Sequence, residues 1–319
     1  MSVTLVDPIG DIILKSGDDS FQVSSKILST ASPVFSVMFS PLFKEGASMV
    51  DGPKEPVAIR LGDDDAEALL AFCNMVHFRT DEISEKPTAT FLERFAVLVD
   101  KYMCKKAVIS QVKVWLLKNL QSLSVTELCP LLLLAYIMDL PERFATISKE
   151  ILFNHVGSYS ELILLADHPL MDSNIVVEFE RKKYELHRMV RKALTSVLYS
   201  LTAFKTDESK YISLYTLKLQ ARGLLPGTDA FEAKSFKQVC WDVSTLSKFH
   251  LQPCKVQGCV CTSHKALEHD RKVARILNNC KDAKVGLCLD CLRSEGSSFP
   301  NCRFTHPLAG DDKALFAAA

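Results

Sequence analysis

The sequence predicts an α+β protein with a small N-terminal sheet, packed helices, a mainly helical region and a cysteine-rich tail. Two short apolar runs, at 12–14 and 21–23, flank a Gly/Asp turn, which is typical of a β-hairpin. Apolar residues recur at helical spacing through most of the chain after residue 66. Seven of the eleven cysteines follow residue 253. These observations predict the order sheet, helices, metal-stabilised tail.

After the hairpin the pattern predicts a helix, a tight break and a second helix. Lys26-Ile27-Leu28 begins the first helix, and Ser32-Pro33 marks the break. Ser32 is suited to accept a hydrogen bond from a free N–H at a helix start, and Pro33 suits the first helical position. The second helix is apolar, with Val34, Phe35, Val37, Met38 and Phe39.

These residues, in this order, resemble the start of a BTB/POZ domain. The matching marks are Asp11 at the first strand, Phe21-x-Val23, Lys26-x-Leu28, Ala31-Ser32-Pro33-x-Phe35, Met38-Phe39 and Phe43-x-Glu45. Ser24-Ser25 replaces the Val-His pair of many animal members and is more similar to the fungal BTB proteins. The resemblance is strong to about residue 61 and fades by about residue 120. It implies a BTB/POZ domain over residues 8–120.

Further elements of this domain are expected from pattern and capping signals. Residues 57–61 alternate like a strand. Asp64-x-x-Glu67 resembles a capping pair for a helix over 66–77, and Thr90-x-x-Glu93 predicts a capping box for the next helix. A further helix is expected over 108–120.

Cys73 and His77 lie four residues apart on the helix expected at 66–77 and could share a metal. Two ligands with no others nearby make a poor site. A core cysteine and a histidine at the helix end are therefore the favoured interpretation.

A helical extension is expected over residues 121–249. Ser124-x-x-Glu127 and Ser158-x-x-Glu161 open helices, and Pro141 suits the start of the helix between them. A long amphipathic helix is predicted over 173–202, and another helix ends at Gly223. The long helix carries a basic set off its apolar face, namely Arg181, Lys182, Lys183, Arg188, Arg191 and Lys192. A solvated face is favoured over a nucleic-acid-binding ridge.

Residues 250–308 form a Cys/His-rich region that predicts bound zinc. The candidate ligands are Cys254, Cys259, Cys261, His264, Cys280, Cys288, Cys291, Cys302 and His306. Cys288-x-x-Cys291 has the spacing that lets two thiolates hold one tetrahedral zinc. Free structural thiols are the alternative, and a redox CxxC lacks its expected βαβ context.

Helix length constrains the ligand pairing. Residues 265–279 fit a helix about 22 Å long, so His264 and Cys280, at its two ends, are too far apart to bind one ion. The favoured structural zinc uses Cys288 and Cys291 with Cys254 and either Cys259 or Cys261, and His264 as substitute. Cys302-x3-His306 is expected to belong to a second site, with Cys280 or a spare ligand.

Composition excludes some classes of protein. The 319 residues include 38 basic and 38 acidic side chains, and this neutral balance argues against a general nucleic-acid binder. The sequence contains no run of 18 apolar residues, so no membrane span is predicted. The N-terminus lacks the features of a secretory signal. We therefore expect an intracellular protein, in cytoplasm or nucleus, with reduced cysteines.

No phosphate loop, HExxH motif, nucleophile elbow or kinase signature is present, so a non-enzymatic role is expected. The resemblance implies a protein-protein interaction module. Some family members are substrate adaptors of ubiquitin ligases that bind a cullin scaffold through a hydrophobic-x-Glu motif, which Phe43-Lys44-Glu45 matches. The alternative is a scaffold or transcription-associated protein whose zinc-stabilised tail binds another protein or nucleic acid. Homodimerisation stays open, although ten N-terminal residues are too few to supply the extra helix and strand that swapped BTB dimers exchange.

Overall fold

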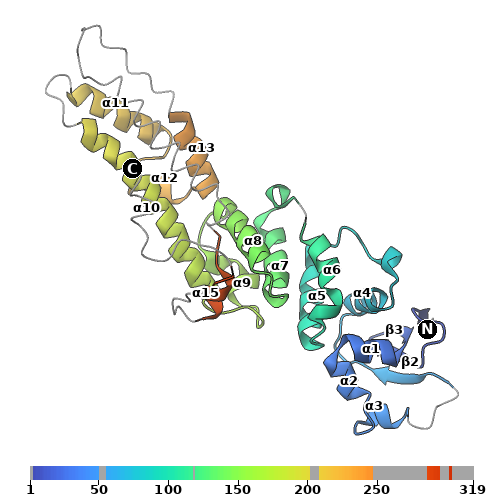
Figure 1. Ribbon diagram of the computed structural model, residues 1–319. Coiled ribbons are helices and arrows are strands. Elements are labelled where there is room, and N and C mark those ends of the chain that lie inside the picture. Colours follow the sequence, from blue (N-terminus) through green and yellow to red (C-terminus); the bar gives the residue numbers. More distant parts are fainter. Residues whose placement is uncertain are drawn as a thin grey trace. The chain divides into compact units, whose positions relative to one another are not determined.

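The computed structural model describes residues 3–49, 55–117, 119–201, 208–246, 286–294 and 302–303 (Figure 1). The chain divides into two compact units, one ending at Arg143 and the other beginning at Phe144. A four-stranded mixed sheet with helices lies in the first unit, and the second is mainly helical among its described residues. The predicted α+β class is therefore confirmed. No helix within these ranges is long and apolar enough to cross a bilayer.

The sheet is built around the predicted hairpin. Its strands are β1 (Thr4–Leu5), β2 (Ile12–Ser16), β3 (Asp19–Val23) and β4 (Val57–Arg60). Their order is β1-β3-β2-β4, with β2 and β3 antiparallel and both outer strands parallel to their neighbours. Gly17 in the turn has a φ of 55°, which glycine adopts without strain. The predicted hairpin thus forms the two central strands of the sheet.

Helices α1 to α7 complete the first unit. They are α1 (Ser25–Ala31), α2 (Pro33–Met38), α3 (Lys44–Ala47), α4 (Ala66–Val76), α5 (Ala89–Lys101), α6 (Lys105–Trp115) and α7 (Val125–Ile137). The predicted break between α1 and α2 is confirmed, because Ser32 Oγ accepts the Phe35 N–H at 3.2 Å. The same hydroxyl donates to the Tyr102 carbonyl at 2.6 Å. Phe35 stacks on Tyr102 with ring centroids 4.3 Å apart, which ties the helix pair to α5.

The cap of α4 differs from the predicted one by a single residue. Asp65, rather than Asp64, caps the helix, since its carboxylate accepts the Ala68 N–H at 2.9 Å. The Asp64 carboxylate instead accepts hydrogen bonds from Tyr102 and Lys101. Glu67, expected to complete the capping pair, bonds to Arg94. Contacts with other helices thus engage both Asp64 and Glu67, which the capping pattern had assigned to the start of α4.

The expected capping box at Thr90 is also corrected. Thr88 caps α5, because its hydroxyl accepts the Phe91 N–H at 3.2 Å. Thr90 lies inside the first turn and cannot cap the helix. Helix α6 ends at Trp115, and Leu120 belongs to a separate short turn. The helix predicted over 108–120 therefore begins earlier and ends earlier than its apolar spacing indicated.

The second unit contains the amphipathic helices of the predicted extension. They are α8 (Pro141–Asn154, which begins in the first unit), α9 (Ile163–Ala166), α10 (Ile175–Leu201), α11 (Glu208–Ala221), α12 (Asp229–Glu232), α13 (Phe236–Leu246) and α15 (Leu289–Arg293). The capping box at Ser124 and the start of α8 at Pro141 are confirmed. Ser158, by contrast, opens only a three-residue turn, Tyr159–Glu161.

Helices α10, α11, α12 and α13 enclose one apolar core. Its buried members are Leu186, Val190, Leu194, Tyr215, Leu219, Leu224, Phe231, Phe236, Val239, Val243 and Leu246. The side chain of His187 lies among them, 2% exposed, with its ring 5.4 Å from that of Phe231. The predicted apolar stripe of α10 therefore packs against its own helical neighbours.

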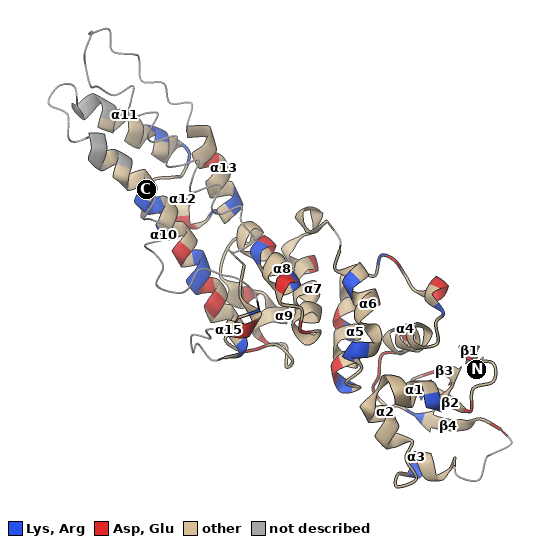
Figure 2. Cartoon of the chain, in the orientation of Figure 1, with Lys and Arg blue, Asp and Glu red and all other residues tan. Residues whose placement is uncertain are grey.

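Acidic neighbours surround the basic residues of α10. Arg181 forms ion pairs with Glu178 at 2.7 Å and Glu185 at 2.5 Å, and Arg191 pairs with Glu232 at 3.2 Å. Figure 2 shows basic and acidic residues interleaved along this helix. This pairing favours the solvated face over a basic ridge.

Candidate metal centre

Three cysteines of the C-terminal region meet in the structure. Cys288 stands directly before α15, Cys291 lies within it, and Cys302 follows in the next described segment. Their sulfur atoms all lie within 4.8 Å of one another. The Sγ atoms of Cys291 and Cys302 are 3.5 Å apart. This triad could hold a metal ion.

The short helix that carries two of these thiols is docked on α8. Leu289 and Leu292 are buried, and the Leu287 N–H donates to Ser148 Oγ on α8 at 2.8 Å. Gly286 lies so close to α8 that an added Cβ would sit 1.8 Å from the Ala145 carbonyl oxygen. Only glycine fits this close approach, so the CxxC segment packs at a defined position against α8.

An ion pair brings the third cysteine to the other two. The Asp290 carboxylate, between Cys288 and Cys291, accepts the Arg303 backbone N–H at 2.8 Å. It also accepts the Arg303 guanidinium through Nη2 at 2.6 Å and Nε at 3.0 Å. Cys302 directly precedes Arg303, so this charge-assisted contact positions its thiol.

The protonation state of the triad thiols is linked to metal binding. Burial raises the pKa of the Cys288 thiol. Burial and, next, the hydrogen bond with Cys302 raise the pKa of Cys291. Thiolates this close repel one another, so without a cation the group favours its neutral form. A metal ion reverses this preference, since metal-bound thiols are deprotonated.

The sulfur spacing also fits a tetrahedral thiolate site. With metal–sulfur bonds of 2.3 Å, the sulfur atoms of a tetrahedron lie about 3.8 Å apart. The 3.5 Å between the Sγ atoms of Cys291 and Cys302 is close to this spacing and far longer than the bond of a disulfide, about 2.05 Å. No disulfide joins any of the cysteines in the described ranges. The triad thus supplies three corners of a site with room for a fourth ligand.

The observed grouping corrects the predicted pairing of Cys302. The sequence assigned Cys302 to a second site with His306, whereas the structure places it beside Cys288 and Cys291. The reason is the contact between Asp290 and Arg303, which spacing alone did not reveal. The other predicted ligands, namely Cys254, Cys259, Cys261, His264, Cys280 and His306, lie outside the described residues, as does the helix expected at 265–279.

Cys73 is the core cysteine, and His77 the histidine at the helix end, that the sequence favoured. Cys73 is fully buried, and burial raises its pKa. His77 Nδ1 lies 2.8 Å from the Cys73 carbonyl oxygen, and Nε2 accepts the Ser24 N–H at 3.1 Å. Both ring nitrogens are therefore engaged in packing α4 against the start of α1.

The two residues of the hydrophobic-x-Glu motif lie at α3. Phe43 precedes the helix and is 47% exposed, so it is not a core residue. Glu45 is half-buried in the first turn. The motif is thus presented at the surface of the first unit.

Comparison with known proteins assigns no family to the chain. No protein-family model, curated protein or solved structure matches it. The function must therefore be argued from the two sites themselves.

Proposed function

We propose that the chain is a non-enzymatic protein-interaction module with an N-terminal BTB/POZ domain, and that it acts as a substrate adaptor for a cullin-type ubiquitin ligase. The hairpin followed by paired helices α1 and α2 supports the first part. The observation that carries the second part is the exposed Phe43 in the matching motif.

The surface around Phe43 has the character of a binding site. Leu42 is 91% exposed beside it, and Val37 on α2 is exposed as well. Exposed large apolar side chains are expected where a partner covers them. Gly46 of α3 packs closely against the preceding loop, since a Cβ there would lie 2.0 Å from the Ser40 carbonyl oxygen.

Binding of the intact, zinc-loaded chain to a cullin N-terminal domain tests the adaptor role. Micromolar or tighter binding is expected, and a Phe43→Ala/Glu45→Lys double variant should lose it. The matched control is Leu117→Ala/Glu85→Lys, which changes an exposed apolar and an exposed acidic residue elsewhere in the first unit. Absence of binding by a folded protein would refute the adaptor role and leave a scaffold.

We further propose that the cysteine triad holds a structural zinc ion. Thiolate-rich tetrahedral sites select zinc among the common cellular cations. Cys288, Cys291 and Cys302 supply three ligands, and the fourth comes from the other predicted Cys and His residues. Bound zinc would further stabilise the contact between α15 and α8.

Zinc content measured on the purified chain tests this assignment. At least one zinc per chain is expected, and Cys302→Ser should lower the content and the affinity. The control is Cys240→Ala, which removes a cysteine of α13 away from the triad. Equal zinc content in both variants would exclude Cys302 as a ligand.

A further inference from the structure

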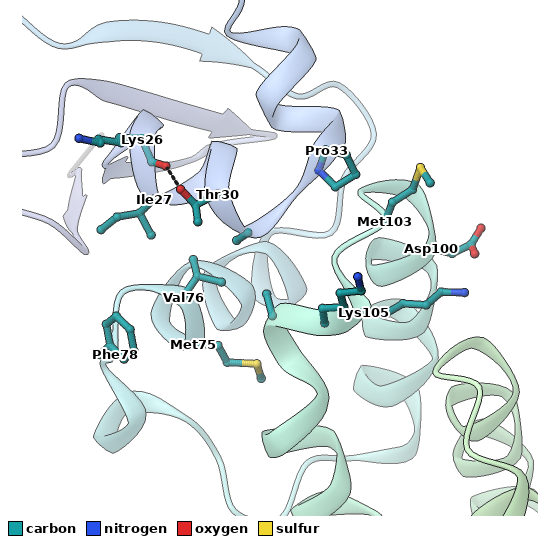
Figure 3. A pocket seen from close by; sticks show the side chains of 13 residues that line it. Lys26, Ile27, Thr30, Pro33, Met75, Val76, Phe78, Asp100, Met103 and Lys105 are labelled. Carbon is teal, nitrogen blue, oxygen red and sulfur yellow. Dashed lines mark hydrogen bonds between the residues drawn. The ribbon is translucent and has the colours of Figure 1, made fainter.

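A groove separate from both sites lies in the first unit. It runs between α1 with the start of α2 on one side and the end of α4 with the α5–α6 junction on the other, and its volume is about 970 Å³. Figure 3 shows Ile27, Thr30 and Pro33 along one wall and Met75 and Val76 facing them. The groove shares no lining residue with the Phe43-Lys44-Glu45 segment.

Each end of the groove carries one large apolar side chain in an unusual backbone conformation. Phe78 follows α4 with a φ of 61°, and Met103 follows α5 with a φ of 50°. They are 88% and 63% exposed. Figure 3 shows them at opposite ends of the groove.

The hydrogen bonds at both positions are those of a helix end that usually carries glycine. The Phe78 N–H bonds to the Met75 carbonyl, and the Met103 N–H bonds to the Asp100 carbonyl. Glycine adopts this left-handed conformation without strain, whereas Phe and Met do not. Neither side chain gains burial within the unit that would offset the strain. Strained, exposed apolar residues at both ends of one groove indicate a binding role.

The charge around the groove is positive. Among the described residues that line it, Lys26, Lys105 and Lys106 are basic and Asp100 is acidic. None of the three lysines forms an ion pair with any described residue. A symmetric contact between two copies would place this positive surface against itself, which argues against a second copy as occupant.

We propose that this groove binds an acidic, apolar peptide segment of another protein. Its apolar side chains contact Met75 and Val76 between the two end residues, Phe78 and Met103. Its carboxylates pair with Lys26 at one end and with Lys105 and Lys106 at the other. Apolar anchors flanked by complementary charge are the usual means of recognising such segments.

Peptide selection on the intact chain tests the proposal. The probe is a display library of random peptides of about 16 residues, which span roughly 24 Å as helices. Enriched sequences should combine Leu, Ile or Phe with Asp or Glu, and a synthetic copy should bind more weakly as salt rises. Enrichment of basic or neutral peptides, or of none, would overturn the proposal.

Glycine variants separate binding from stability. Phe78→Gly and Met103→Gly remove the apolar groups and also relieve the strained backbone, so each variant should fold at least as well while binding the peptide at least 10-fold more weakly. Lys106→Glu should weaken binding, whereas Lys113→Glu, an exposed lysine of α6 outside the groove, should not. Unchanged binding in both glycine variants would overturn the proposal. A dimer that these variants dissociate would identify a second copy as the occupant and would also overturn it.

Discussion

The Asp290 carboxylate accepts three hydrogen bonds from Arg303, one from its backbone N–H and two from its guanidinium. Asp290 lies between two cysteines of the triad and Arg303 follows the third. The contact therefore holds together two chain segments that each supply thiols to the candidate metal site. It bears on that site through the position of Cys302 rather than as a ligand.

Asp290→Asn should lower zinc affinity about 10- to 100-fold, as loss of an outer contact does at other metal sites. The amide is uncharged, and its NH2 group cannot accept a hydrogen bond, so it loses at least one of the three Arg303 contacts and Cys302 is held less firmly. Competition with a chelating indicator measures the affinity. Asp229→Asn, which changes an exposed acidic residue in the first turn of α12, is the matched control. Equal affinity in the two variants would contradict the positioning role.

Gly286→Ala should release the CxxC segment from α8. Its Cβ would lie 1.8 Å from the Ala145 carbonyl oxygen, and backbone atoms on both sides must then move. Overpacking of this kind costs about 1–3 kcal/mol. Hydrogen exchange over residues 286–294 should rise markedly in the variant.

Ser148→Ala provides a companion measurement for Gly286→Ala. It removes the acceptor of the Leu287 N–H without adding volume. A buried N–H without a partner costs about 1–3 kcal/mol, so exchange should rise here as well. Unchanged exchange in both variants would show that residues 286–294 do not depend on their packing against α8.

Elements set by neighbouring residues were predicted from the sequence. The hairpin follows from its Gly/Asp turn, and the break between α1 and α2 follows from Ser32-Pro33. The capping errors arose where several candidates stood together. Asp64 and Asp65 are both suitable caps, and the choice was decided by Tyr102 and Lys101, which bind Asp64 from another helix.

In the candidate metal site too, local spacing predicted some ligands, whereas a contact between separate segments determined another. The CxxC spacing is local and indicated Cys288 and Cys291 as ligands of one ion. The third ligand depends on an ion pair between residues 290 and 303, and no spacing rule specifies it. Asp290 inside the CxxC motif and Arg303 directly after Cys302 were the only sequence signals available for this contact.

Ser32→Ala should destabilise the first unit by about 2–4 kcal/mol. The hydroxyl caps α2 and also donates to the buried Tyr102 carbonyl, so one substitution removes two contacts. Chemical denaturation measures the loss. Ser36→Ala, at an exposed position of the same helix, should change stability by less than about 0.5 kcal/mol. A loss below 1 kcal/mol for Ser32→Ala would contradict the dual role.

His187 should make the second unit less stable in mild acid. The imidazole is buried, and its Nε2 has no hydrogen-bond partner among the described residues. Burial lowers its pKa below the ordinary value of 6.5, with Lys183 and Arg191 acting in the same direction and Glu232 opposing them. The unfolded chain therefore takes up this proton at higher pH than the folded one. Stability should be full above pH 6.5 and should fall as the pH drops below it.

Denaturation midpoints across this pH range, measured on the intact chain and on His187→Phe, test the prediction. The phenyl ring suits the contacts with Phe231 and Phe236 and carries no titrating group. The variant should lose less stability than the native chain between pH 7 and pH 5, and the difference isolates the contribution of His187 from that of other groups. An equal or steeper loss in the variant would show that the imidazole is not the source of acid sensitivity.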